Sequence, residues 1–234
     1  QFSSRLLISR IIFKMRKARI LDRAALSYKI RKTYIIDKKH SLFLCKDRCY
    51  IVIEEEDNML TTERLFIEKF TPEEIPELMK IEHAPDNCKF TWTNTKEEHE
   101  EELNDPKVLT LAVKRREDGY IVGDVIVNLD VESEWFEIKR IAFREKGKGY
   151  GRETMEALIK YAFEEMKMNK VWLEAYTDNE VGRNLYNSLG FHTDGILRQH
   201  HKTERGILDQ MQFSMLRDEY KKLKEKGTFQ EEMR

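Results

Sequence analysis

The chain has 234 residues, of which 40% are hydrophobic and 36% charged, and its formal net charge is −1. This length suffices for one medium domain with a substantial core. Three scattered cysteines exclude a disulfide framework, and no apolar run reaches membrane-spanning length. We therefore expect a cytoplasmic protein that does not insert into membranes.

The first 58 residues differ from the rest. Residues 1–50 hold 14 Lys/Arg against 3 Asp/Glu, a net of +11, which leaves 28 basic and 40 acidic residues elsewhere, a net of −12. We interpret 1–58 as a basic N-terminal extension, translated from upstream sequence and not native, with Met59 as the true start. A basic nucleic-acid-binding arm and an Arg-rich targeting segment are the alternatives.

Residues 64–143 predict strands interrupted by two helices. Residues 64–70 alternate like a strand. Thr71-Pro72-Glu73-Glu74 joins a cap residue, a proline and two acids, which predicts a helix to about His83. A second helix is predicted over Lys96–Asn104, with its acidic run 97–102 on a solvated face. A hairpin over 108–114 and 120–130 and a strand over 135–143 follow.

The second half continues the alternation of helices and strands. A long helix is predicted over Gly149–Met166, with Met155, Leu158, Ile159 and Ala162 on one face. A strand over 170–176 and a helix over 180–189 come next, and strands over 190–200 and 207–215 close the sheet. We place His200 and His201 in a mobile, solvated loop; a catalytic role is the alternative, because imidazole titrates near neutral pH. The fold class is α/β, and residues 221–234 are predicted to be a charged C-terminal tail.

A glycine-rich loop between the strand over 135–143 and the long helix is the strongest functional signal. It has the sequence Lys146-Gly147-Lys148-Gly149-Tyr150-Gly151-Arg152. Glycine lets the backbone approach a ligand closely, and the first amides of a helix have no partner within the helix. Together with the cationic side chains, these features predict an anion site. The spacing fits neither a P-loop nor a Rossmann fingerprint, and an ordinary turn is the alternative.

Two motifs resemble the GNAT superfamily of N-acetyltransferases. The loop is similar to [QR]-x-x-G-x-[GA], with Lys146 in place of Gln or Arg, although the frame Arg144 to Gly149 satisfies that pattern literally. Residues 179–191 are similar to N-x-x-[AG]-x-x-x-Y-x-x-x-G-F, and residues 59–65 to a GNAT opening strand. The resemblance covers roughly residues 60–220 and implies a domain over 59–220. The implied fold is a mixed, largely antiparallel sheet flanked by helices and splayed between its fourth and fifth strands.

The resemblance implies acetyl-CoA as co-substrate and no metal. The amides around Gly147 to Arg152 would hold the pyrophosphate, and Lys146 would add charge. Ile141, Ala142 and Phe143 would lie beside the pantetheine arm, and Asn179 would contact it from the start of the later helix.

The resemblance also implies direct transfer without an acyl-enzyme. Tyr186 is the expected general acid, because a phenol can protonate a departing thiolate. Glu137 is the expected general base, and Glu174 is a weaker candidate. Packing against the cofactor is the alternative role for Tyr186, and an ordinary surface carboxylate is the alternative for Glu137.

The acceptor is less well specified by the sequence. The C-terminal part resembles the branch that acetylates ribosomal-protein N-termini (RimJ/RimL-like), and polyamine and aminoglycoside acetyltransferases share that outline. The acidic catalytic portion favours a cationic amine. A non-catalytic acyl-CoA-binding module is the competing function. Nucleic acid is not expected as a partner, and a homodimer is an open alternative.

Overall fold

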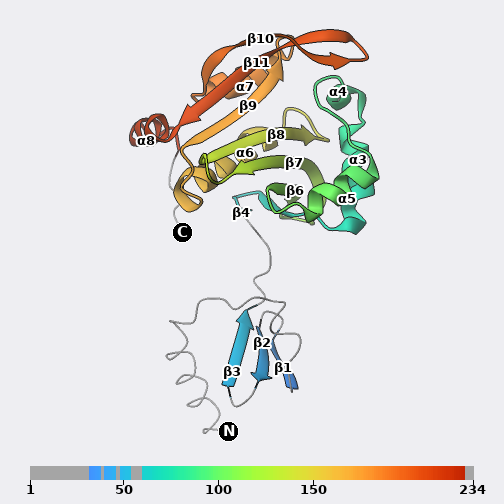
Figure 1. Ribbon diagram of the computed structural model, residues 1–234, viewed down its shortest axis with the longest axis vertical. Coiled ribbons are helices and arrows are strands. Elements are labelled where there is room, and N and C mark those ends of the chain that lie inside the picture. The colour runs from blue at the N-terminus through green and yellow to red at the C-terminus, as the bar shows by residue number, and fades with distance from the viewer. Residues whose placement is uncertain (1–31, 38–39, 46–47, 54–59, 230–234) are drawn as a thin grey trace. The chain divides into compact units, whose positions relative to one another are not determined.

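The computed structural model describes residues 32–37, 40–45, 48–53 and 60–229, and the chain divides into two compact units, 1–56 and 57–234. The first unit contains an antiparallel sheet in the order β1-β2-β3 (Figure 1). Its strands are β1 (Lys32–Asp37), β2 (His40–Cys45) and β3 (Arg48–Ile53). Residues 1–31, and with them most of the predicted basic extension, lie outside the described part.

The second unit is built on an eight-stranded sheet in the order β10-β11-β9-β8-β7-β6-β5-β4. All its neighbouring strands are antiparallel except the parallel pair β8 and β9. The strands are β4 (Leu60–Thr61), β5 (Leu65–Lys69), β6 (Val108–Arg115), β7 (Ile121–Asp130), β8 (Trp135–Phe143), β9 (Lys170–Tyr176), β10 (His192–Thr203) and β11 (Gly206–Leu216). The predicted fold class is confirmed.

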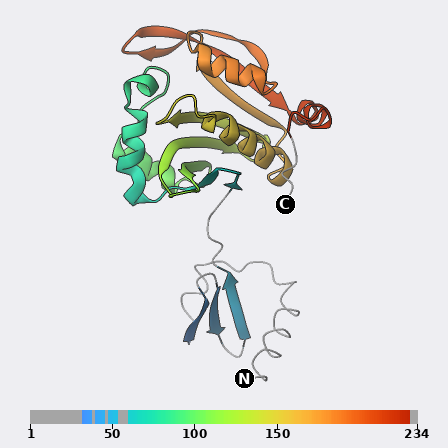
Figure 2. The ribbon, with the colours of Figure 1, turned by 180° about the vertical axis from the view of Figure 1, so that it is seen from behind.

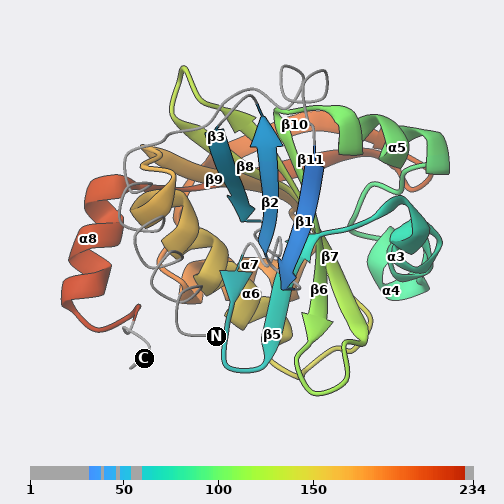
Figure 3. The same cartoon turned by 90° about the horizontal axis from the view of Figure 1, so that it is seen from below.

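Helices cover both faces of this sheet. Figures 2 and 3 show α6 and α7 on one face and α3, α4 and α5 on the other. The helical segments are η1 (Pro72–Glu74), α3 (Ile75–Glu82), α4 (Pro85–Cys88), α5 (Lys96–Asn104), α6 (Tyr150–Lys160), the π-helical turn η2 (Tyr161–Glu165), α7 (Glu180–Ser188) and α8 (Arg217–Glu225). In the described part of the chain, no helix combines the length and apolarity needed to cross a membrane.

Two predicted boundaries differ from the structure. Strand β10 continues to Thr203, so His200 and His201 belong to a strand and not to a mobile loop. The boundary predicted at 220/221 falls inside α8, where Tyr220 is buried and stacks on Phe163 of η2. The buried Tyr220 ring fixes α8 against the core, so the first part of the segment 221–234 is helical.

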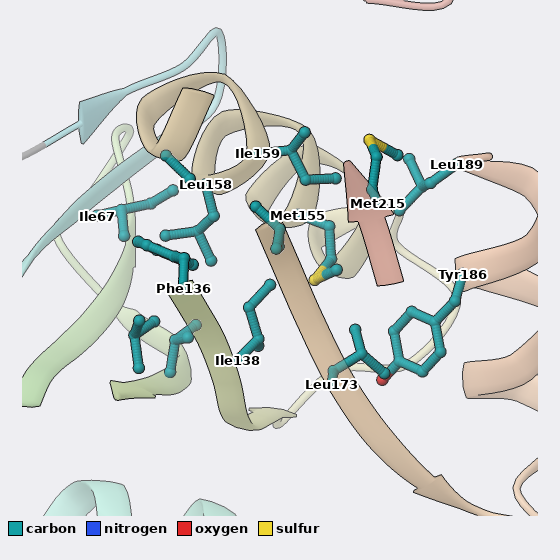
Figure 4. Close-up of a cluster of buried hydrophobic side chains, with 14 of the residues drawn as sticks. Ile67, Phe136, Ile138, Met155, Leu158, Ile159, Leu173, Tyr186, Leu189 and Met215 are labelled. Carbon is teal, nitrogen blue, oxygen red and sulfur yellow. The ribbon is translucent and has the colours of Figure 1, made fainter. Parts of the chain in front are cut away.

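The main core lies between the sheet and the α6–α7 layer (Figure 4). Met155, Leu158 and Ile159 of α6 are fully buried against Phe136 and Ile138 of β8. Burying one such side chain contributes about 1.5–3 kcal/mol. The spacing of these α6 residues is the predicted apolar stripe, and their burial fixes which face of the helix meets the sheet.

The parallel strands β8 and β9 separate part-way along their length. They pair at only three positions, the last of which joins Glu137 to Trp172. Beyond that point, the described chain has no pairing between residues 138–143 and residues 173–176. Backbone groups that lose a strand partner can bond an extended ligand. The predicted separation of the fourth and fifth GNAT strands is therefore present, here between β8 and β9.

Strand β8 carries an irregularity that changes which side chains face each layer. Ile126 pairs with Arg140 and Val127 with Ile138, so Lys139 is an extra residue. A bulge of this kind re-aims the side chains that follow it. As a result, Ile138 faces α6, whereas Arg140 turns to the α3–α5 face.

Candidate active site

The glycine loop joins the end of β8 to α6. Gly147 and Gly149 have φ of 72° and 79°, values that favour glycine, and Gly149 is the N-cap residue of α6. A Cβ on Gly147 would meet no atom within 4 Å. The loop thus leaves open space at the N-terminus of α6, where unpartnered amides and the helix dipole favour an anion.

The cationic side chains of the loop are not all directed to that space. Lys146 Nζ donates to the side-chain oxygen of buried Asn87, and burial lowers the pKa of Lys146 despite the nearby carboxylates. Arg152 donates to Ser188 and, at 3.1 Å, to Glu156. Lys148 is exposed. The amides of the loop are therefore the better-defined part of the anion site.

Arg64 was missed by the sequence reasoning and holds the loop in place. Its Nη1 donates to the carbonyl of Lys148 at 3.0 Å, and its Nε donates to Glu153 at 2.7 Å. Glu153 also accepts a 2.5 Å hydrogen bond from Thr62 Oγ1. A Cβ on Gly149 would stand 3.3 Å from Arg64. The turn between β4 and β5 thus holds the glycine loop in place through the side chains of Thr62 and Arg64.

The three residues predicted to lie beside pantetheine occupy the separated end of β8. Ala142 and Phe143 are buried, and Ile141 packs against the main core. A Cβ on Gly123 would approach the Phe143 ring to 2.5 Å, so glycine is needed there. The Phe143 carbonyl accepts from Asn87 Nδ2 at 3.0 Å. These contacts fix the wall of the split between β8 and β9.

Helix α7 presents Tyr186 to the same split. Asn179 caps this helix by accepting from the Gly182 amide at 3.0 Å, and a Cβ on Gly182 would approach Asn179 to 2.9 Å. Figure 4 shows Tyr186 reaching from α7 toward Leu173 of β9. Burial raises the pKa of Tyr186 to about 12. The phenol is therefore protonated at neutral pH and able to donate.

Two carboxylates lie on the opposite face of the sheet. Glu137, the last residue of β8 that pairs with β9, accepts from Asn128 Nδ2 at 2.9 Å. Glu174 follows Leu173 on β9 and therefore points away from Tyr186, because successive strand side chains alternate. Burial raises the pKa of Glu174; the neighbouring charge of Glu137 adds to this and that of His200 opposes it. The split thus has a phenol on one face and carboxylates on the other.

An aromatic cluster that the sequence reasoning missed borders this carboxylate face. Trp92, 60% exposed, stacks on His201 with ring centroids 4.4 Å apart. The Tyr176 hydroxyl bonds His201 Nδ1, and Arg205 lies 5.1 Å from the Tyr176 ring. The members of this cluster are far apart in the sequence, so no local sequence motif predicts their contact.

A buried ionic cluster lies on the same face of the sheet, between α3, α5 and the strands. Arg140 donates to Glu82 at 2.5 Å and to Asn94 at 2.8 Å, and His99 Nε2 lies 3.1 Å from Glu82. Burial opposes protonation of His99, but hydrogen bonds to Glu102 and Glu82 outweigh it and raise its pKa to about 9. The predicted solvated face of this acidic helix is wrong at His99, which is fully buried.

Asp124 on β7 adds a second carboxyl to this cluster. It is fully buried, and neither side-chain oxygen has a hydrogen-bond partner among the described residues. Burial, helped by Glu82, raises the pKa of Asp124 well above its ordinary value. Within the described ranges, no group of three or more His, Cys, Asp or Glu side chains could hold a metal ion.

Solved structures share this fold. An acetyltransferase (GNAT family) from Bacillus anthracis is 20% identical, with a TM-score of 0.59 over 68% of this chain and 98% of that one. A variant of the SpeG spermidine N-acetyltransferase from Vibrio cholerae is 17% identical, with a TM-score of 0.60 over 68% and 97%. At these identities the likeness extends to the fold alone.

Sequence comparison gives the family. An uncharacterized N-acetyltransferase, p20, from Bacillus licheniformis is 34% identical over 74 residues, which cover 32% of this chain and 42% of that relative. The family profile described as "Acetyltransferase (GNAT) domain" matches residues 64–192, more than half of the chain. The chain therefore belongs to the GNAT family of acetyltransferases, which use acetyl-CoA as co-substrate.

Proposed function

We propose that this protein moves an acetyl group from acetyl-CoA directly to a primary amine. The observation that carries the proposal is the alignment of three features along one path. The open glycine loop at the start of α6 follows the end of β8 that no longer pairs with β9, and Tyr186 of α7 points toward Leu173, just past the last β9 pair with β8. An anion site, a backbone edge and a proton donor are what a phosphorylated thioester with an extended arm requires.

In this proposal, the α7 side of the split supplies the proton donor and the opposite side supplies the proton acceptor. The amine attacks the thioester carbonyl, and Tyr186 donates its proton to the departing thiolate. The burial that raises the tyrosine pKa also disfavours a charged thiolate beside it, so the two groups remain matched for proton transfer. A carboxylate on the other face, Glu137 or its neighbour Glu174, receives the proton of the amine.

For the acceptor we propose a cationic amine, either a protein N-terminus as in the ribosomal-protein branch or a polyamine or aminoglycoside. The two carboxylates beside the split and the exposed Trp92 face support a cation at this position. The similarity to a spermidine acetyltransferase is one of fold and does not favour polyamines over N-termini.

Acetyl-CoA binding is tested by thermal unfolding of the full chain. At one hundred times Kd, a ligand specific for the native state adds about 2.7 kcal/mol, which corresponds to a rise of several degrees in Tm. Gly149→Val should abolish the rise, because φ 79° disfavours a side chain there and its Cβ would stand 3.3 Å from Arg64, which holds the loop in place. Gly227→Val is the control for backbone strain: Gly227 follows α8, has φ 80°, and a Cβ there would meet no atom within 4 Å.

Transfer is tested by thiol release in the presence of amino-terminal peptides, polyamines, aminoglycosides and free amino acids. Turnover with one class identifies the acceptor. A Tm rise with acetyl-CoA and no thiol release with any class would instead support a non-catalytic acyl-CoA-binding module. Absence of both would contradict the proposal.

A further inference from the structure

Glu174 and His200 form an acid–base pair at the open part of the sheet. His200 Nε2 lies 3.6 Å from Glu174 Oε2, a distance that one imidazole rotation or one water molecule can bridge. We propose that Glu174 takes the proton from the acceptor amine and that His200 passes it to solvent. This inference rests on the proposed acetyl transfer and assigns its base.

Strand β9 places Glu174 opposite the proposed acid. Leu173 faces Tyr186 on the α7 side (Figure 4), and Glu174, the next residue, projects from the other face. Both residues lie just beyond the last β8–β9 pair, at Trp172. A thioester within the split would thus have a proton donor on one side and a proton acceptor on the other.

A bulge in β10 brings His200 to this position. Leu197 pairs with Gln210 and His201 with Leu208, so residues 198–200 lie opposite Asp209 alone. Gln199 adopts φ 50°, and its amide donates to Asp209 at 2.7 Å. Such a bulge redirects the side chain that follows, here His200.

His200 lies between the half-buried Glu174 carboxylate and solvent. The Glu174 side chain is 21% exposed and that of His200 is 48% exposed. His200 also lines an open hollow of about 660 Å³, together with Ile196, Leu197, Arg198, Gln199 and Asp209. A proton received by Glu174 therefore has a short route to solvent through His200.

The charges around Glu174 tune it as a base. Glu137 on β8 and His200 on β10 are the charged groups nearest to it, and its β11 register partner is the neutral Gln212. Farther along β10, His201 is bonded to Tyr176. Burial and Glu137 raise the pKa of Glu174, whereas His200 lowers it. Glu174 therefore has a raised proton affinity, and the charge of the neighbouring His200 reduces that affinity.

The proton balance of the step is complete. A cationic acceptor first gives one proton to solvent, so that the neutral amine attacks. Its nitrogen then forms a bond to the thioester carbon, and the carbon–sulfur bond breaks. The thiolate takes the proton of Tyr186, and Glu174 takes the proton of the amine. His200 delivers a proton to solvent, and the phenol is reprotonated from solvent, so that neither group is consumed.

Glu174→Gln should lower kcat by about 10²-fold, as for loss of a general base, while acetyl-CoA still raises Tm. Variants of the two charged neighbours, His200 and Glu137, should shift the acidic limb of the kcat pH profile in opposite directions, because His200 lowers the pKa of Glu174 and Glu137 raises it. His200→Gln should move the acidic limb to higher pH, and Glu137→Gln should move it to lower pH, each by about half a unit. His192→Gln is the control, because it removes another β10 histidine paired with a carboxylate, Asp194.

The inference is overturned if Glu174→Gln keeps wild-type kcat, or if the two neighbouring variants leave the limb in place or move it in the same direction. In those cases wild-type turnover still supports acetyl transfer, and only the assignment of the base fails. If the wild-type protein acetylates no amine, the proposed function fails and this assignment with it.

Discussion

The two faces of the sheet are built on opposite principles. On the α6 face, Phe136 and Ile138 of β8 pack into an apolar layer with Leu158 and Ile159. On the α3–α5 face, Arg140 of the same strand belongs to a buried ionic cluster with Glu82. The single extra residue at the bulge separates the two. One strand can thus contribute to an apolar layer on one face and to a polar cluster on the other, because its side-chain alternation is shifted once.

The largest expected effect comes from breaking the ionic face. Arg140→Met leaves Glu82 buried without its guanidinium partner and should destabilise the fold by about 3–5 kcal/mol. Chemical denaturation measures the loss. The double variant Arg140→Met with Glu82→Met should recover part of it, since this charge pair is then removed and His99 keeps Glu102 as a partner. A single variant as stable as wild type would show that the pair is not coupled.

On the apolar face, the expected effect is catalytic and not structural. Tyr186→Phe removes only the hydroxyl and should lower kcat by about 10²-fold, while the acetyl-CoA-induced rise in Tm and the fold stability are kept. Stopped-flow acetyl transfer, which isolates the chemical step, is the measurement. Loss of acetyl-CoA binding instead would mean that this tyrosine mainly positions the thioester.

The pH dependence of stability should also come from the ionic face. The folded-state pKa of His99 is raised to about 9 from 6.5, so its contribution is complete below pH 6.5 and is lost as the pH rises through 9. We expect a loss on the order of 1–2 kcal/mol between pH 7 and 9. Urea unfolding across this range checks it, and His99→Gln should flatten the curve.

The smallest effect should be a gain. Asp124 has a raised folded-state pKa, so stability falls as the pH rises above 3.8, its ordinary value. Asp124→Asn keeps the shape but cannot ionise, and it should stabilise the protein by about 1 kcal/mol at pH 7. The difference in Tm from wild type should shrink toward pH 4. A destabilised variant would show that the ionised carboxylate is needed.

The sequence by itself determined most of the local structure and the family. The second helix was predicted at the bounds that α5 has, Lys96–Asn104, and the structure shows a local cap there, because Thr95 accepts from the Glu98 amide. The glycines at 147 and 149 predicted a loop whose backbone adopts dihedrals that favour glycine. The spacing of Met155, Leu158 and Ile159 predicted the buried face of α6 for the same reason: each signal lies within a few residues.

Only the tertiary structure decided which distant residues meet. The stack of Trp92 on His201, the ionic cluster of His99 and the pairing of Glu174 with His200 each join separate elements. Bulges in β8 and β10 control two of these contacts, and a bulge depends on strand pairing rather than on composition. The sequence could therefore indicate the proposed cofactor side of the split, whereas the proposed acceptor side depended on how the sheet was assembled.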